Sequence, residues 1–125
     1  MPMFLITMAE PAHFDRWEAM TDSEQQAVLD AYGAFVATVR ERGSVHYGDA
    51  LARPDQAVTL RPGSAADRVA APGPYTETDL QPHGIYVIEQ PDLEAAVAAA
   101  RLLPAPCSIE VRPLLDVYHH AHQPG

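Results

Sequence analysis

Short apolar segments alternate with two helix-forming segments, and this order limits the possible fold more than any other feature of the chain. The apolar segments are rich in branched or aromatic side chains, and Gly, Pro, Asp or Ser bound them, as is typical of strands. We predict strands at residues 3–8, 44–52, 57–61, 67–71, 84–89 and 107–113. The third and fourth of these are close enough in the chain to form a hairpin.

Two other segments have the pattern of helices. Thr21 and Glu24 have the spacing of a capping box, and apolar residues then recur at steps of three and four up to Gly43, where we expect the helix to end. Asp92 is the predicted N-cap of a second helix over residues 93–103.

The resulting order, β-α-β-hairpin-β-α-β, indicates an α+β domain close to the ferredoxin-like split β-α-β fold. Both helices then cover one face of an antiparallel sheet. Apolar side chains across the strands are too numerous for the other face to be wet, which predicts a homodimer packed sheet to sheet. The apolar residues behind this prediction are Phe4, Ile6, Tyr86 and Ile88.

Length and charge exclude several classes of protein. A chain of 125 residues is of single-domain length, and we expect one domain over residues 1–125 with a core at about 3–114 and a tail at 115–125. The formal net charge is −9 without a Lys/Arg cluster, which argues against direct nucleic-acid binding. No apolar segment is long enough to span a membrane. The first ten residues lack a basic n-region, so we predict a strand there, not a secretory signal, and a cytoplasmic protein.

Residues 73–78 (GPYTET), followed by Gln81 and by residues 84–88 (GIYVI), resemble the DGPF-motif segment of YCII-related proteins, whose usual form is DGPF-A-E-T-K-E-x-x-G-G-Y. Four further segments are similar to that family in the same order, so the resemblance covers about residues 3–114. These segments are residues 31–35, 48–54, 91–93 and 108–113.

This resemblance implies a dimeric α/β barrel of ferredoxin-like subunits. Some relatives are associated with extracytoplasmic-function sigma factors, and some resemble lyases that use a histidine and aspartate pair. The chain departs from the family pattern at two positions. The motif aspartate is replaced by Pro72, and the glycine before Gly84 is His83.

His46 is the first candidate catalytic residue, because an imidazole can act as a general base near neutral pH. The structural alternative is a partly buried histidine bonded to the backbone. Asp49 lies three residues further and points to the opposite face of a regular strand. Only a bulge at Gly48 would let Asp49 and His46 cooperate.

The loop over residues 71–84 is the second candidate region. Its prolines restrict the backbone and Gly73 between two of them permits a sharp turn, so we expect Tyr75, Glu77 and His83 to be presented in a fixed geometry, as a binding loop requires. A plain hairpin connection requires the same rigidity. In that case Glu77 bonds loop amides and Tyr75 packs as a core aromatic.

Substrate-binding candidates are Arg112, Glu110, Glu77 and Tyr86. Arg112 and Glu110 share a strand face, so they either pair with each other or line a pocket in which Arg112 holds a substrate carboxylate. The single cysteine, Cys107, cannot form an internal disulfide and is expected to be a small buried apolar residue.

No cofactor or native metal site is expected. Nucleotide-binding glycine loops and the G-x-S-x-G elbow are absent from the sequence. The histidine-rich tail could bind a divalent metal together with His13 or an acid, but it lacks a rigid tetrahedral spacing, so we expect adventitious metal affinity. Its histidines are His119, His120 and His122.

Two functions follow from these residues. The first is a small cofactor-independent lyase or isomerase acting on a small organic substrate, cyclic or aromatic, with His46 as base and His83 or Tyr75 as acid. The second is a non-catalytic dimeric ligand-binding or regulatory protein, paired with a sigma factor as some relatives are.

Overall fold

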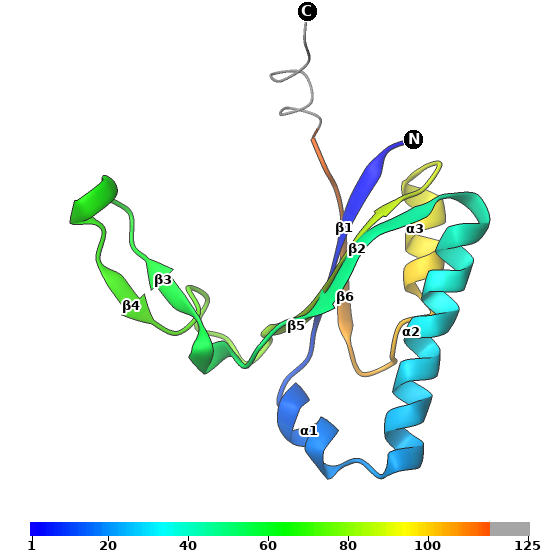
Figure 1. Cartoon of the computed structure of the whole chain (residues 1–125), viewed down its shortest axis with the longest axis horizontal. Helices are drawn as coiled ribbons and strands as arrows, with labels where there is room; N and C mark the ends of the chain where they lie inside the picture. The colour runs from blue at the N-terminus through cyan, green and yellow to red at the C-terminus, as the bar shows by residue number, and fades with distance from the viewer. Residues whose placement is uncertain (116–125) are drawn as a thin grey trace, which may run out of the picture.

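The computed structural model describes residues 1–115 and has a mixed α+β architecture with antiparallel sheets (Figure 1). Its main sheet has four strands in the order β2-β5-β1-β6, every neighbouring pair antiparallel. These strands are β1 (Met3–Ala9), β2 (Ser44–Ala50), β5 (Pro82–Glu89) and β6 (Ser108–Pro113). The predicted α+β class is therefore confirmed, while most of the predicted tail, from residue 116 onward, lies outside the described residues.

Helices α2 (Asp22–Arg42) and α3 (Leu93–Ala100) lie on one face of this sheet, as predicted (Figure 1). The Thr21 hydroxyl accepts the Glu24 N–H and the Glu24 carboxylate accepts the Thr21 N–H, so the capping box forms. The helix ends at Gly43, and the Asp92 side chain caps α3 by accepting the Ala95 N–H. These ends formed where expected because capping satisfies helix-terminal backbone groups locally.

A short helix, α1 (His13–Ala19), was not predicted. It has seven residues, too few for a clear helical periodicity, and Ala12 at its start has a positive φ of 54°. Arg53, which lies outside this helix, contacts two of its residues. The Arg53 guanidinium lies 5.0 Å from the centre of the Phe14 ring and 2.6 Å from a Glu18 oxygen. Tertiary contacts therefore fix this helix, and it covers one end of the sheet.

The core lies between the sheet and the helices. Phe4 pairs with Ile88 in the β1–β5 register and Ile6 with Tyr86; Phe4, Ile6 and Ile88 are at most 2% exposed. The Tyr86 ring packs 4.8 Å from the Phe35 ring of α2. The four residues on which we based the prediction of a sheet-to-sheet dimer therefore lie between the sheet and the helices. They were the wrong residues for that prediction, because they do not belong to the face that the helices leave open. The opposite face carries Leu5, Thr7, Ile85 and Val87, which are half-buried.

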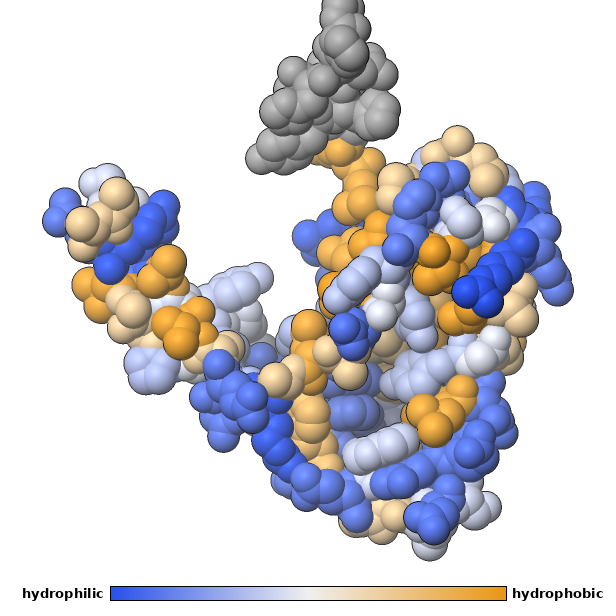
Figure 2. Space-filling model, in the orientation of Figure 1, coloured by the Kyte–Doolittle hydropathy of each residue, from blue (hydrophilic) through white to orange (hydrophobic). Residues whose placement is uncertain are grey.

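Between β2 and β5 the chain forms an arm that projects away from the sheet (Figure 1). The arm contains the predicted hairpin, as β3 (Val58–Leu60) and β4 (Ala70–Pro72). The second strand begins three residues later than predicted, because a 3₁₀ turn occupies Ala65–Asp67; another lies at Pro54–Gln56. Hydrophobic side chains gather on the exposed arm (Figure 2).

Candidate active site beneath the sheet

A bulge in β5 places His83 inside the protein. Met8 pairs with Gly84 but Ala9 pairs with Pro82, so His83 is the extra residue of β5. Its side chain is 3% exposed, and its backbone carbonyl accepts the Leu51 N–H at 2.8 Å. A bulge re-aims a side chain that regular alternation would place elsewhere. The loop residue singled out in the sequence is thus a buried residue at a strand end.

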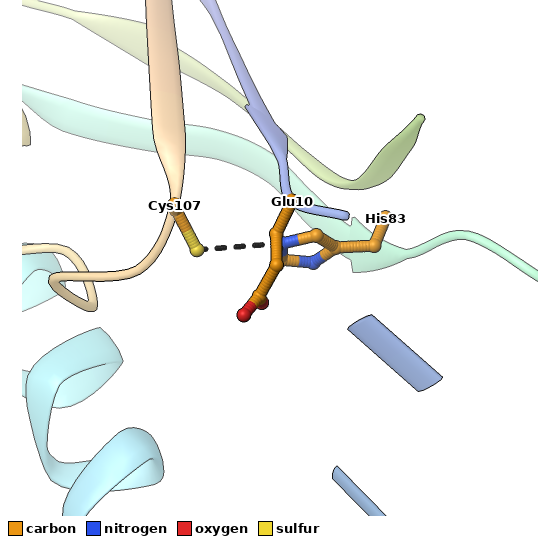
Figure 3. Close-up of side chains that lie close together, drawn as sticks. All are labelled: Glu10, His83 and Cys107. Carbon is orange, nitrogen blue, oxygen red and sulfur yellow. Dashed lines mark hydrogen bonds and ion pairs between the residues drawn. The ribbon is translucent and has the colours of Figure 1, made fainter. Parts of the chain in front are cut away.

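Three further polar residues surround His83. Glu10 follows the end of β1, His13 opens α1 and Cys107 precedes β6. The Cys107 sulfur lies 3.4 Å from His83 Nε2, and Glu10 Oε1 lies 3.8 Å from the same nitrogen (Figure 3). We call these four residues the Glu10 cluster.

Glu10 is the centre of the Glu10 cluster. Its Oε1 lies 2.8 Å from His13 Nδ1, and its Oε2 lies 2.7 Å from an Arg16 guanidinium nitrogen without hydrogen-bond alignment. The carboxylate is 6% exposed. The His13 and His83 rings stack at 3.6 Å with an interplanar angle of 1°. A buried carboxylate thus faces one imidazole at hydrogen-bond distance and a second just beyond it.

Burial sets the charge of these groups. It lowers the pKa of His83 to about 4, assisted by neighbouring His13 and partly opposed by Glu10. It also raises the pKa of Cys107 to about 11, and the Glu10 charge acts in the same direction while Arg16 opposes it. At neutral pH the pair is a neutral imidazole beside a neutral thiol. A thiolate nucleophile, as in cysteine proteases, is therefore not preformed.

The Glu10 cluster borders a largely apolar cavity of about 450 Å³ between α1, α2 and the sheet. His13 and His83 line it together with aromatic side chains. Burial raises the pKa of the Tyr32 phenol to about 12, so this hydroxyl stays protonated. A Cβ on Gly48 would lie 2.4 Å from the Tyr86 ring, so glycine there gives that ring its space. The apolar and aromatic lining is Met8, Phe14, Trp17, Leu29, Tyr32 and Tyr86.

His46 does not reach this cavity. β2 has its bulge between Val45 and Tyr47, so the predicted bulge at Gly48 was wrong in position. His46 Nε2 lies 2.8 Å from Glu89 Oε1, and Glu89 is six residues from His83 along β5. At about 3.3 Å per residue this separates the two histidine sites by about 20 Å.

Asp49 belongs to the cavity wall, but its carboxylate is used elsewhere. It accepts the Tyr47 hydroxyl at 3.1 Å and the Ala50 N–H at 2.8 Å. His46 and Asp49 therefore have separate partners and do not form the dyad considered above.

The remaining predicted residues lie in two other places. Tyr75 is 87% exposed on the arm, so it is not a core aromatic, and with Glu77 it lines a different cavity of about 600 Å³ beside β3. Arg112 and Glu110 pair with each other on the helix-free face of the sheet, as one of our two readings expected. Of the eight predicted site residues, His83, Asp49 and Tyr86 share the cavity.

Sequence reasoning missed Glu10, considered His13 only as a metal ligand beside the tail histidines, and expected Cys107 to be a small apolar residue. The spacing Glu10-x-x-His13 directly after a strand was the available signal. It is weak alone, because acids and histidines are common in surface turns. Cys107 carried no signal, since strand pairing is what brings it to His83.

Among the described residues, Glu10, His83 and Cys107 form a group whose potential metal-ligand atoms all lie within 4.8 Å of one another. The tail histidines lie outside the described residues.

Within the described part, no helix combines the length and apolarity that crossing a membrane requires.

No protein-family model matches the chain, and the search of curated proteins found no match. The resemblance to YCII-related proteins therefore stays a prediction that rests on the quoted segments, and the Glu10 cluster has to be interpreted from its own geometry.

Proposed function

We propose that the protein is an enzyme that transfers a proton within a small organic substrate, a lyase or isomerase, with His13 as the general base in place of His46. The observation that carries this proposal is the Glu10 to His13 contact at the wall of an apolar cavity. The reaction class is the one expected from the sequence, and the base is a different residue.

The contact gives the two groups distinct roles. When Glu10 accepts the Nδ1 proton of His13, the Nε2 of that ring keeps a free lone pair for a substrate proton. The imidazolium that forms is then stabilised by the carboxylate 2.8 Å away. Glu10 is a positioning residue, and its burial strengthens this electrostatic effect.

The walls indicate the kind of substrate. Aromatic and aliphatic side chains favour a flat apolar body, and about 450 Å³ suits a molecule of one or two rings. Neutral His83 and the protonated Tyr32 hydroxyl are two donors at this cavity that can stabilise a developing oxyanion. A small cyclic or aromatic carbonyl compound meets these requirements.

The strand order β2-β5-β1-β6 supports a ferredoxin-like subunit, because β2 and β6, the second and fourth strands of this sheet along the chain, flank the central antiparallel pair of β1 and β5.

We also propose a homodimer. The half-buried apolar residues on the helix-free face and the exposed Val58, Leu60 and Tyr75 of the arm support it. Sedimentation at several protein concentrations tests this, and a monomer throughout would contradict it.

The second candidate function is a non-catalytic ligand-binding or regulatory protein, in which a sigma factor is one conceivable partner. The exposed arm favours it, because apolar side chains that project from a small domain suit protein contacts. In this function the same cavity binds a ligand without chemical change.

The test is proton exchange in deuterated water with a chelator present. Cyclic and aromatic carbonyl compounds are first screened for binding by ligand-observed NMR, and those that bind are followed for loss of carbon-bound protons. We expect exchange by the native protein and a fall of more than about 100-fold in His13→Gln, since general bases contribute about 10²–10⁴-fold.

His46→Gln is the matched control, because it removes a histidine with the same 2.8 Å carboxylate contact outside the cavity. Exchange should be unchanged in this variant. Compounds that bind but exchange with neither protein would favour the binding function, and exchange retained in His13→Gln would exclude His13 as the base.

A further inference from the structure

The Glu10 cluster also has the spacing of a metal site. A tetrahedral zinc ion with bonds of about 2.0–2.3 Å holds its donor atoms about 3.3–3.7 Å apart. Here the Cys107 sulfur and His83 Nε2 are 3.4 Å apart, and His83 Nε2 and Glu10 Oε1 are 3.8 Å apart. The third pair, the Cys107 sulfur and a Glu10 oxygen, lies within 4.8 Å, so a shift of about 1 Å or less brings all three atoms into contact with one ion.

The surroundings of these atoms differ from those of a chance surface cluster. Glu10 is 6% and His83 3% exposed, and Glu10 Oε2 makes no hydrogen bond that meets ordinary geometry. A buried carboxylate is costly unless opposite charges or donors surround it, and while Arg16 lies 2.7 Å from Oε2, a cation bound at Oε1 would add a second opposite charge. Glu10 follows β1, His83 lies in β5 and Cys107 precedes β6, so three strands of one sheet hold the donors in place (Figure 3).

We propose that Glu10, His83 and Cys107 bind a divalent transition-metal ion of the zinc class. The inference goes beyond the proposed function, because proton transfer by His13 needs no ion. It revises the expectation of no native metal, which considered the tail histidines together with His13 or an acid.

The donor set decides the kind of ion. A thiolate with an imidazole selects zinc, cobalt or copper over magnesium and calcium, which prefer oxygen ligands. Three protein ligands leave a fourth position open, as in catalytic zinc sites. His13, stacked on His83 at 3.6 Å and bonded to Glu10, is placed to orient these two ligands.

Binding involves a defined proton transfer. Cys107 is a thiol in the metal-free protein, so forming the metal–sulfur bond releases its proton to solvent, while His83 binds through a lone pair it already has. Thiolate and carboxylate together balance the charge of a divalent ion. The ion and its three ligands together then carry no net charge, with the Arg16 guanidinium 2.7 Å from Glu10 Oε2 outside the ligand set.

The test is titration of the chelator-treated full-length protein with Co²⁺, followed by displacement with Zn²⁺. We expect a thiolate-to-cobalt charge-transfer band that saturates at one ion per chain and disappears on adding zinc. Because Cys107 is the only cysteine, this band reports the Glu10 cluster and not the histidine-rich tail.

Two variants decide the result, with circular dichroism as the check on folding. Cys107→Ser should abolish the band, and His83→Asn should weaken binding by more than about 100-fold, because loss of even an indirect partner costs 10–100-fold. His46→Asn should bind as the native protein does. Should either cluster variant fail to fold, protection of native Cys107 from alkylation by one equivalent of Zn²⁺ supplies the same information.

Absence of the thiolate band in the folded native protein would overturn the proposal, as would a band of equal strength in His83→Asn. Alkylation at the same rate with and without zinc would also overturn it. The proton-exchange assay contains chelator and measures the activity of His13 without a metal ion. Failure of the metal proposal therefore leaves the proposed function intact, and failure of the proposed function leaves the metal proposal intact.

Discussion

Two histidine–carboxylate pairs in this protein have the same contact distance and different surroundings. His13 Nδ1 lies 2.8 Å from Glu10, and His46 Nε2 lies 2.8 Å from Glu89. The side chains of the first pair are 19% and 6% exposed, and those of the second are 43% and 28% exposed. Contact distance therefore does not distinguish a candidate active site from a surface ion pair.

The two pairs differ in the other groups that contact each carboxylate. Glu10 also faces Arg16 and the buried His83, and its histidine borders the apolar cavity. The Glu89 carboxylate pairs with His46 on the helix-free face of the sheet. Water screens the exposed pair, so its contribution to stability and chemistry is small.

The largest expected difference is in activity. Glu10→Gln keeps the shape of the side chain and removes the charge that stabilises imidazolium at His13, so we expect the exchange rate to fall about 100-fold. Glu89→Gln makes the same change in the exposed pair and should leave the rate within about twofold. NMR exchange with chelator present measures both, and equal losses would remove the distinction between the pairs.

A smaller difference is expected in stability. Glu10→Ala leaves Arg16 and two histidines without their carboxylate, at a cost we place at about 2 kcal/mol, below the full penalty for a buried pair because Arg16 is half-exposed. Glu89→Ala should cost about 0.5 kcal/mol or less. Urea unfolding of the chelator-treated proteins gives both values. A cost for Glu89→Ala as large as that for Glu10→Ala would show that burial is not the cause.

The smallest difference concerns reagent access to the native protein. Diethyl pyrocarbonate modifies neutral imidazoles that solvent reaches, so His46 should react first, His13 later and His83 last. Peptide mapping by mass spectrometry assigns each modified histidine separately. Modification of His83 as fast as that of His46 would mean that the interior opens readily, and the cavity would then not exclude water.

Local signals predicted most of the fold. Thr21, Glu24, Gly43 and Asp92 fixed helix ends, because caps satisfy backbone groups within a few residues of themselves. Runs of branched apolar residues bounded by turn residues predicted the strands, because this signal also lies within a few neighbouring residues. Helix α1 was missed, since Arg53, which is distant in sequence, supports it.

The candidate site was predictable only in part. His83 was recognised as an unusual residue in its loop, yet its partners Glu10 and Cys107 are far from it in sequence. His46 looked equally suitable, because a sequence pattern shows which residues can act as bases and not which of them face a cavity.

The sequence by itself determined the types and order of the helices and strands, and which acidic, histidine and cysteine side chains are available to form a site. Tertiary structure decided which of them meet. One extra residue in β5 turns His83 inward, and antiparallel pairing of β1 with β5 and β6 brings Glu10 and Cys107 to it. Such contacts depend on register and bulges, and these are set by the packing of the whole sheet against its helices and not by any single segment.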